Sequence, residues 1–158
     1  MKLSCSADWR YLPGNISSTP TFGLGTGIDL ILLDRLVLGA AFDISARYER
    51  NYGYGYGYRP QPERPSPYWF YFLSGRAGYR IPLDTSVDID LTPHVGAGLY
   101  MEPGMEQGDS YNSMLVYAGI ESDIRLFTHT ALKARLQIIA TPDGRIGYNT
   151  GIGLSFLL

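Results

Sequence analysis

The feature of this 158-residue sequence that most restricts its fold is an alternation of apolar and polar residues that recurs eight times along the chain. In each of the eight segments, charged side chains occur at only one parity. In the sixth segment, for example, Glu121, Asp123 and Arg125 all stand at odd positions, and the even positions carry no charge. Successive side chains of a strand point to opposite faces, so the pattern predicts eight strands that each have one uncharged face. The predicted strands cover about residues 2–12, 21–33, 36–49, 68–81, 87–101, 112–126, 131–140 and 145–158.

The segments between the predicted strands contain residues that favour turns. Proline fixes φ, and Gly, Asn and Asp tolerate positive φ, so such segments can reverse the chain. No linker or change of composition separates one part of the chain from another, which predicts a single domain over residues 1–158. The turn segments include Pro13-Gly14-Asn15, Pro82-Leu83-Asp84, Pro103-Gly104 and Pro142-Asp143-Gly144.

The composition argues against several classes of protein. Hydrophobic residues make up 45% of the chain and charged residues 18%, a balance too apolar for a disordered protein. The formal net charge of -2 leaves no basic surface for nucleic acid, so no nucleic-acid partner is expected. Cys5 is the single cysteine, and no cluster of residues has the spacing of a metal site. We therefore expect neither an intrachain disulfide nor a metal or other cofactor.

The apolar stretches are too short for transmembrane helices. A spanning helix needs about 20 consecutive apolar residues, and the longest candidate, residues 30–42, is interrupted by Asp34 and Arg35. The polar, strand-like segment that follows Met1 and Lys2 does not have the form of a secretory leader. Because an exported barrel requires a leader, we expect this to be a mature chain whose signal peptide has been removed.

Eight alternating strands fit two kinds of closed barrel. A soluble lipocalin-like barrel turns its apolar face inward around a ligand, whereas a membrane barrel turns that face outward to lipid. Glycine is frequent on the charged face, at positions such as Gly25, Gly27 and Gly151, which suits the cramped interior of an eight-stranded membrane barrel. No Lys or Arg stands on a predicted apolar face, where one at mid-bilayer would cost about 2–4 kcal/mol. These observations favour the membrane barrel, with the lipocalin-like barrel as the alternative.

Aromatic residues lie near the two ends of the predicted apolar face. An even number of strands places both termini at one end, and most of these aromatics then fall near the other end. Belts of Trp and Tyr that border an aliphatic band are typical of membrane interfaces. The predicted girdle consists of Trp9, Tyr11, Tyr48, Trp69, Tyr71, Tyr79, Tyr148 and Phe156.

The last predicted strand resembles the insertion signal of outer-membrane proteins. That signal places a polar residue, a glycine two positions later and hydrophobic residues at its sixth and eighth positions, here Asn149, Gly151, Leu154 and Phe156. With its eight strands, the whole chain resembles the small outer-membrane barrels of the OmpA and OmpX type. The resemblance implies an eight-stranded antiparallel up-and-down transmembrane β-barrel in the bacterial outer membrane, in contact with outer-membrane lipids. It also implies folding by the outer-membrane insertion machinery and long loops exposed at the cell surface.

The charged face of the predicted barrel carries acids and bases in similar numbers. In a narrow interior these side chains can neutralise one another through charge-assisted hydrogen bonds. We therefore expect a lumen plugged by ion pairs, with a narrow small-solute channel as the alternative. The predicted lumen network consists of Asp8, Arg10, Asp29, Asp43, Arg47, Arg76, Arg80, Asp88, Asp90, His94, Glu121, Asp123, Arg125, Lys133 and Arg135.

Two histidines raise the question of catalysis, because some small barrels modify lipids. His94 is predicted to face inward with Asp90 on the same face, and Ser45 or Ser113 could supply a nucleophile. His129 stands in a short turn at the terminal end. A hydrogen-bonded interior histidine explains His94 more simply. We therefore predict no catalytic residues and keep a lipid-modifying enzyme as an alternative.

Tyrosine and glycine alternate in the longest predicted loop, residues 50–67. Tyr52, Tyr54, Tyr56 and Tyr58 would share one face if the third strand continued into this loop. Tyrosine combines a large rigid contact area with a polar tip, which suits a binding surface. We predict a contact here with a host or envelope partner, against the alternative of a loop without a dedicated partner. The leading prediction is a non-enzymatic barrel with a structural, adhesion or surface-interaction role.

Overall fold

The computed structural model describes residues 1–11, 21–48, 67–102 and 111–158. Every regular element in these residues is a β-strand. β5 continues the line of β4, and both pair with β6, so the nine labelled segments make an eight-stranded sheet. The segments are β1 (Lys2–Tyr11), β2 (Thr21–Leu32), β3 (Leu36–Tyr48), β4 (Pro67–Tyr79), β5 (Ile81–Leu83), β6 (Ile89–Glu102), β7 (Tyr111–Phe127), β8 (Thr130–Ala140) and β9 (Ile146–Leu157).

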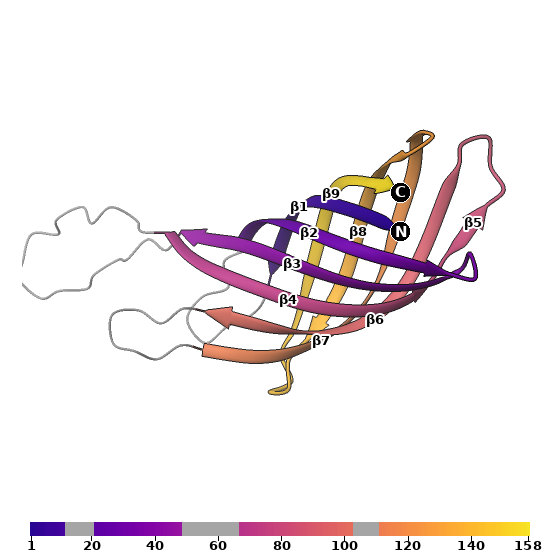
Figure 1. Cartoon of the computed structure of the whole chain (residues 1–158). Coiled ribbons are helices and arrows are strands. Elements are labelled where there is room, and N and C mark those ends of the chain that lie inside the picture. Colours follow the sequence, from indigo (N-terminus) through magenta and orange to yellow (C-terminus); the bar gives the residue numbers. More distant parts are fainter. Residues whose placement is uncertain (12–20, 49–66, 103–110) are drawn as a thin grey trace, which may run out of the picture.

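The sheet closes on itself as a barrel. Neighbouring strands pair antiparallel throughout, and the first strand, β1, pairs with the last, β9. Both termini lie at one end, which we call the terminal end (Figure 1). The strand ends that border residues 12–20, 49–66 and 103–110 lie at the opposite end, which we call the loop end (Figure 1). This architecture confirms the predicted eight-stranded antiparallel up-and-down barrel.

The tilt of the strands determines which side chains meet inside. The line of paired residues that begins with Arg10 on β1 continues through Asn149 and Gln137 and reaches His94 on β6. It arrives at Ile31, beside the terminal end of β2, although Arg10 lies at the loop end of β1. Such a stagger corresponds to strands tilted by about 35–45° from the barrel axis. Each level of the lumen is therefore filled from the loop half of some strands and the terminal half of others.

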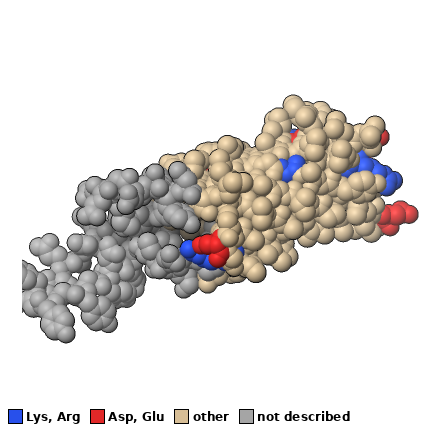
Figure 2. All heavy atoms as spheres, turned by 90° about the horizontal axis from the view of Figure 1, so that it is seen from below, with Lys and Arg blue, Asp and Glu red and all other residues tan. Residues whose placement is uncertain are grey.

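The two faces of the wall are arranged in the opposite sense to those of a water-soluble barrel. Outward positions of the described strands carry no Asp, Glu, Lys or Arg, and Leu24 and Ile152 are 73% and 66% exposed there. Figure 2 shows the wall as almost entirely uncharged, with the few charged atoms in view mainly near its ends. The fully buried side chains instead include Arg10, Glu121 and Asp29. The described part of the chain contains no helix that could cross a bilayer.

The hydrogen-bonded wall is interrupted between β4 and β5. Pro93 of β6 stands opposite Tyr79 in the register that β4 and β5 share. Proline has no N–H to donate to the neighbouring strand, so the ladder is broken at this position. On the opposite side of the strand, the amide of Arg80 donates to the carbonyl of Arg35, in the β2–β3 turn, at 2.7 Å, which continues the pairing with β3. The predicted strand 68–81 is thus divided in two, and its partner strand begins at Ile89.

The β2–β3 connection is a tight turn at the terminal end. Leu33 and Asp34 have φ values of 50° and 61°, and the amide of Arg35 donates to the carbonyl of Leu32 at 3.1 Å. Two successive positive φ values give the mirror-image turn that matches the twist of antiparallel strands. This turn holds the terminal ends of β2 and β3 together and brings Arg35 beside β4.

Candidate functional site

The lumen contains a balanced set of ionised side chains. The buried set consists of five carboxylates, Asp8, Asp29, Asp43, Glu121 and Asp123, and five cations, Lys2, Arg10, Arg76, Lys133 and Arg135. We divide it by contact into two clusters, each with equal numbers of acids and bases. The terminal-side cluster contains Lys2, Asp29, Arg76, Glu121, Asp123 and Lys133, and the loop-side cluster contains Asp8, Arg10, Asp43 and Arg135.

Arg76 lies at the centre of the terminal-side cluster. Its guanidinium donates to both carboxylate oxygens of Asp29 at 2.7 Å and also contacts Glu121. The Nζ atom of Lys133 lies 3.1 Å from Glu121, and that of Lys2 lies 3.6 Å from Asp29. A bidentate guanidinium–carboxylate pair is among the stronger arrangements of opposite charges in proteins. Each acid here therefore has at least one close cation, as burial of its charge requires.

The loop-side cluster joins β1, β3 and β8. Arg135 donates to Asp8 at 2.5 Å, and Arg10 donates to Asp43 at 3.2 Å. A longer contact of 3.9 Å between Arg135 and Asp43 links the two pairs. Ser6 completes the group by donating to Asp8 at 2.9 Å. The cluster thus connects strands on different sides of the barrel through its interior.

Glycines of the polar face make room for these side chains. A Cβ atom at Gly151 would lie 2.0 Å from Asp8 Oδ1, and one at Gly39 would lie 2.1 Å from Asp29 Oδ1. Neither distance is compatible with a side chain unless the buried carboxylate moves. The frequency of glycine on the charged face is therefore explained by close approach of ionised side chains from neighbouring strands.

His94 is fully engaged in hydrogen bonds inside the barrel. Its Nδ1 atom lies 3.1 Å from the carbonyl of Thr92, and its Nε2 atom lies 2.9 Å from the side-chain nitrogen of Gln137. The oxygen of Gln137 accepts from Asn149 at 2.9 Å, and the Tyr117 ring packs edge-on at 6.1 Å. The carbonyl requires a donor and the amide requires an acceptor, so this arrangement fits a neutral imidazole with its proton on Nδ1.

The residues that could have formed a catalytic group with His94 are placed elsewhere. Asp90 pairs with Arg80 at 2.6 Å, and Ser113 donates to the carbonyl of Met114. Among the described contacts, neither Ser113 nor Ser45 bonds to the imidazole. Among the residues that the structure describes, no nucleophile and orienting acid are therefore placed around His94 as a catalytic triad requires.

An apolar layer that was not predicted fills the loop half of the lumen. Phe70 and Tyr100 are stacked with centroids 5.5 Å apart, and Phe72 packs edge-on against a second tyrosine. The guanidinium of Arg10 lies 4.7 Å from the centre of the Phe72 ring, so the layer borders the loop-side cluster directly. The signal was present in the sequence as large hydrophobic residues of inward parity. The apolar layer consists of Phe70, Phe72, Tyr100, Leu115, Tyr117 and Ile139.

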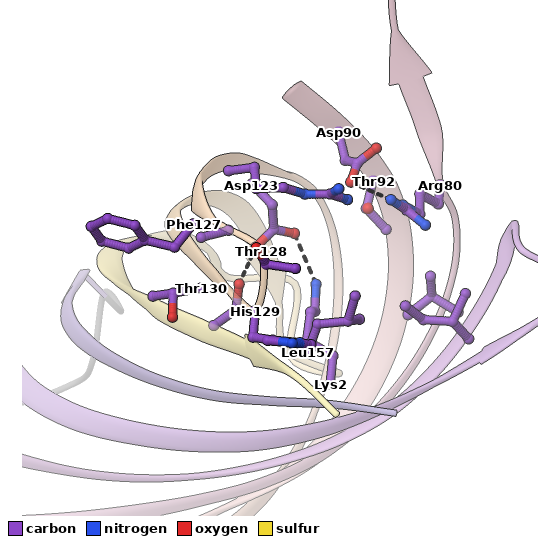
Figure 3. Close-up of a pocket in the computed structure, with 15 residues that line it drawn as sticks. Lys2, Arg80, Asp90, Thr92, Asp123, Phe127, Thr128, His129, Thr130 and Leu157 are labelled. Carbon is purple, nitrogen blue, oxygen red and sulfur yellow. Dashed lines mark hydrogen bonds and ion pairs between the residues drawn. The ribbon is translucent and has the colours of Figure 1, made fainter. Parts of the chain in front are cut away.

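The terminal end of the lumen opens into a small cavity, which we call the mouth pocket (Figure 3). The cavity has a volume of about 40 Å³. It is lined by residues of the β2–β3 and β7–β8 hairpins and of the first and last strands, β1 and β9. On one side, Lys2 and Ser155 each donate to Asp123 at 2.8 Å. On the other side, Arg80 donates to Asp90 at 2.6 Å. Its lining also includes Thr92, Arg125, Phe127, Thr128, His129 and Thr130.

The prediction for Asp88 is wrong. Its parity assigned it to the lumen, but β6 begins one residue later, at Ile89. The Asp88 side chain is 71% exposed at the rim, where it lies 3.5 Å from Arg125. The backbone carbonyl of Asp88 still accepts from the amide of Arg125 at 2.9 Å, so the main chain follows β7 to this residue while the side chain lies in water. Parity alone did not show where the strand starts.

The described aromatic residues of the predicted girdle face outward near the two ends. At the loop end, Tyr11 stacks on Tyr148 with centroids 5.4 Å apart, and Trp9 packs edge-on against Tyr148 at 6.0 Å. At the terminal end, the hydroxyl of Tyr79 accepts from Arg35 at 3.1 Å. Described members of the girdle also include Trp69, Tyr71 and Phe156.

Several predicted residues lie outside what the structure describes. Tyr52, Tyr54, Tyr56 and Tyr58 of the predicted contact loop are among them, as are the side chains of Arg47 and Tyr48. The four residues of the insertion signal are all described on β9. Of these, Asn149 and Gly151 are buried, and Leu154 and Phe156 are exposed on the outer wall.

The β8–β9 turn at the loop end is held by its own side chains. The hydroxyl of Thr141 donates to Asp143, and Arg145 lies 2.5 Å from the same carboxylate. The hydrogen bond from Thr141 and the charge of Arg145 hold the pKa of Asp143 below its usual value. This turn therefore keeps an ionised, locally neutralised pair at the surface of the loop end.

Comparison with solved structures supports the fold. Neisserial surface protein A (NspA) superposes with a TM-score of 0.70 at 10% identity, over 99% of this chain and 96% of that one. The N-terminal β-barrel domain of Pseudomonas aeruginosa OprF gives 0.54 at 15% identity, over 98% and 97% of the two chains. A third match is Ail, the attachment invasion locus protein of Yersinia pestis, in complex with the heparin analogue sucrose octasulfate. Its TM-score is 0.56 at 13% identity, over 98% of this chain and 96% of that one.

No family model and no curated protein sequence matches this chain. The likeness is therefore one of architecture and not of sequence. The structural neighbours are small eight-stranded barrels of bacterial outer membranes, which confirms the predicted resemblance and fold class.

Proposed function

We propose that the chain is an integral barrel of the bacterial outer membrane with a structural or surface-interaction role. The observation that carries the proposal is the distribution of charge across the wall. Described outward strand positions are free of Asp, Glu, Lys and Arg, and ten ionised groups are buried within. A water-soluble barrel would expose a continuous apolar surface far larger than soluble monomers carry. A hydrocarbon environment removes that cost, and the closed sheet leaves no unpaired edge facing lipid. The distribution of charge therefore disfavours the lipocalin-like alternative.

Heat modifiability tests the membrane placement. A folded outer-membrane barrel in detergent should migrate faster on a gel before boiling than after, because it stays compact in the detergent. Extraction should also require detergent. Recovery of a monodisperse folded protein in plain buffer would reject the proposal and restore the lipocalin-like barrel.

The lumen is proposed to be closed to solutes. Two ion-pair clusters with balanced charges and the apolar layer occupy the lumen between the two ends. An eight-stranded interior is generally filled by side chains. The narrow channel remains the competing function. Purified protein in planar bilayers should give no steady conductance steps. Reproducible steps that are lost when Arg76 or Glu121 is changed would favour the channel instead.

The surface role is proposed to reside in the loops at the loop end. Two of the structural neighbours are a surface protein and an attachment invasion protein, by their names. Residues 50–67 of this chain, with their four alternating tyrosines, are the proposed contact for a host or envelope partner. Protease added to intact cells should cut this loop first. Cleavage confined to the turn at residues 82–86 would invert the proposed orientation.

Two further relationships belong to this proposal. The outer wall would contact membrane lipids, and the pattern Asn149, Gly151, Leu154 and Phe156 on β9 would be recognised by the outer-membrane insertion machinery. We propose no enzymatic activity, because both nitrogens of His94 are engaged in hydrogen bonds to other groups. Lipids extracted from cells that express the protein should match those from cells with His94→Ala. A lipid modification that disappears in this variant would show catalysis.

A further inference from the structure

One cation at the terminal end, Arg125, is less fully paired than the cations inside the barrel. Arg76 is held by two buried carboxylates. Within the described residues, Arg125 contacts a single carboxylate, that of Asp88, and their separation of 3.5 Å exceeds a charge-assisted hydrogen bond. The two side chains are 40% and 71% exposed, so water screens their attraction. The guanidinium of Arg125 therefore has N–H groups that can donate hydrogen bonds to an anion placed closer than Asp88.

The other charged side chains that line the mouth pocket are paired with one another. Figure 3 shows Arg80 directing its guanidinium towards Asp90 and Thr92. Deeper in the pocket, Asp123 accepts from both Lys2 and Ser155, so its negative charge is compensated locally. Asp90 is likewise compensated by Arg80. With these acids paired, Arg125 is the least tightly paired arginine among the described residues that line the cavity, because its contact with the exposed Asp88 is long.

The size of the cavity limits what it can hold. Its volume is about 40 Å³, and one water molecule needs about 10–15 Å³ on this scale. The pocket therefore has room for a small compact group of a few non-hydrogen atoms and none for a large ligand. Thr92, Thr128 and Thr130 line the same space, and a threonine hydroxyl can act as a hydrogen-bond donor.

From these observations we infer that the mouth pocket binds a phosphate group, with Arg125 as its principal ligand and Arg80 and nearby threonine hydroxyls as supporting donors. The planar fork of arginine matches the oxygens of phosphate, and it is more weakly hydrated than an ammonium group. A metal ion is not the expected occupant, because the described residues contain no group of three His, Cys, Asp or Glu side chains placed to hold one. The inference goes beyond the proposed function, which assigns no ligand to the lumen.

Titration of the folded barrel with inorganic phosphate tests the site directly. Isotope-labelled protein in uncharged detergent micelles would be titrated at constant ionic strength, with chloride replaced by phosphate. Saturable chemical-shift changes are expected at the backbone amides of residues 128–131, and none at the β8–β9 turn of the opposite end. The variant Arg125→Gln should weaken the apparent affinity at least about tenfold, since a hydrogen bond to a charged group is lost.

A matched control and a variant of opposite effect make the result specific. Arg35→Gln removes the same charge at the same end of the barrel, but Arg35 lies outside the mouth pocket and bonds to Tyr79. It should leave the affinity unchanged. Asp88→Asn removes the competing carboxylate and should tighten phosphate binding by about twofold to fivefold. This variant keeps the test valid even if Arg125→Gln does not fold.

A second titration distinguishes free phosphate from a lipid headgroup. Phosphatidylglycerol would be added to the same micelles in place of inorganic phosphate. Saturable shifts at residues 128–131 with either ligand, weakened by Arg125→Gln, support the site and identify its source of phosphate. Shifts that do not saturate, or an equal loss in Arg35→Gln and Arg125→Gln, would show only general attraction of anions and overturn the inference. Heat modifiability of the same samples tests the membrane barrel separately, so loss of phosphate binding alone would leave the proposed function intact.

Discussion

Arginine–carboxylate pairs occur in this barrel in two settings, and the difference between them separates structure from binding. In the lumen, Arg76 is held by Asp29 and Glu121, whose side chains are 1% and 0% exposed. At the mouth, Arg125 and Asp88 lie 3.5 Å apart with much of each side chain in water. A buried acid without its cation is costly, whereas an exposed pair contributes about 0–1 kcal/mol. The same chemistry therefore fixes the interior and leaves the rim able to exchange partners.

The largest expected effect comes from breaking the interior pairing. Arg76→Met keeps an unbranched side chain at this position but removes a cation that Asp29 and Glu121 share. The terminal-side cluster then retains three carboxylates and two cations, Lys2 and Lys133. The free energy of unfolding should fall by about 3–5 kcal/mol, the usual cost of leaving a buried charge uncompensated. Urea unfolding in lipid vesicles, followed by the fluorescence of Trp9 and Trp69, would measure the change.

The matched variant at the mouth is Arg80→Met. Its ion pair with Asp90 is equally short, at 2.6 Å, but the two side chains are 25% and 20% exposed. The expected loss is about 1 kcal/mol or less, because water can solvate the remaining carboxylate. Equal losses in the two variants would contradict the distinction between lumen and mouth.

A charge placed on the outer wall should have the next largest effect. Ile152 lies midway along β9 and is 66% exposed on the wall. If lipid surrounds it, Ile152→Arg should cost about 2–4 kcal/mol, whereas Ile146→Arg near the loop end should cost about 0–1 kcal/mol. Unfolding of both variants in the same vesicles gives the comparison. No dependence on position along β9 would argue against a bilayer around the wall.

Adding a single methyl group tests whether the glycines beside the buried carboxylates are needed for space. A Cβ at Gly151 would lie 2.0 Å from Asp8 Oδ1, whereas one at Gly75, on the outer face, would have only the carbonyl of Gly39 near it, at 3.9 Å. Gly151→Ala should destabilise the barrel by about 1–3 kcal/mol through overpacking. Gly75→Ala should be neutral within about 0.5 kcal/mol. A neutral Gly151→Ala would mean that Asp8 can move without breaking its bond to Arg135.

The wall of the barrel could be predicted from the sequence because parity is a local property. A strand of period two places Asp8 inward and Leu24 outward whatever its neighbours are, so the faces follow once the strands are found. If strands that follow one another in the sequence pair with each other, the barrel is then complete once the first strand also pairs with the last. The division of β4 from β5 was in principle visible, since Pro93 cannot donate in the middle of a sheet.

The partners inside the lumen could not be predicted in the same way. Which acid meets which base depends on the tilt of the strands, and this is not encoded in the alternation of any one strand. Lys2 pairs with Asp123, across 121 residues of sequence. The apolar layer was missed for a different reason: Phe72 and Ile139 share the inward parity of the charged residues, and the interior was expected to be polar throughout.

Asp88 provides the finest test of the comparison between lumen and mouth, because it has the parity of a lumen residue and the exposure of a rim residue. If exposure decides, Asp88→Asn should change the free energy of unfolding by no more than about 0.5 kcal/mol. Asp123→Asn, in contrast, alters a carboxylate that binds Lys2 and Ser155 and is 7% exposed, and should cost about 3–5 kcal/mol. Both changes are isosteric and remove one negative charge at the terminal end, so a general effect of charge would move both equally. Urea unfolding of the two variants under identical conditions decides between these outcomes. A loss above about 2 kcal/mol for Asp88→Asn would show that the rim pair is part of the structural network.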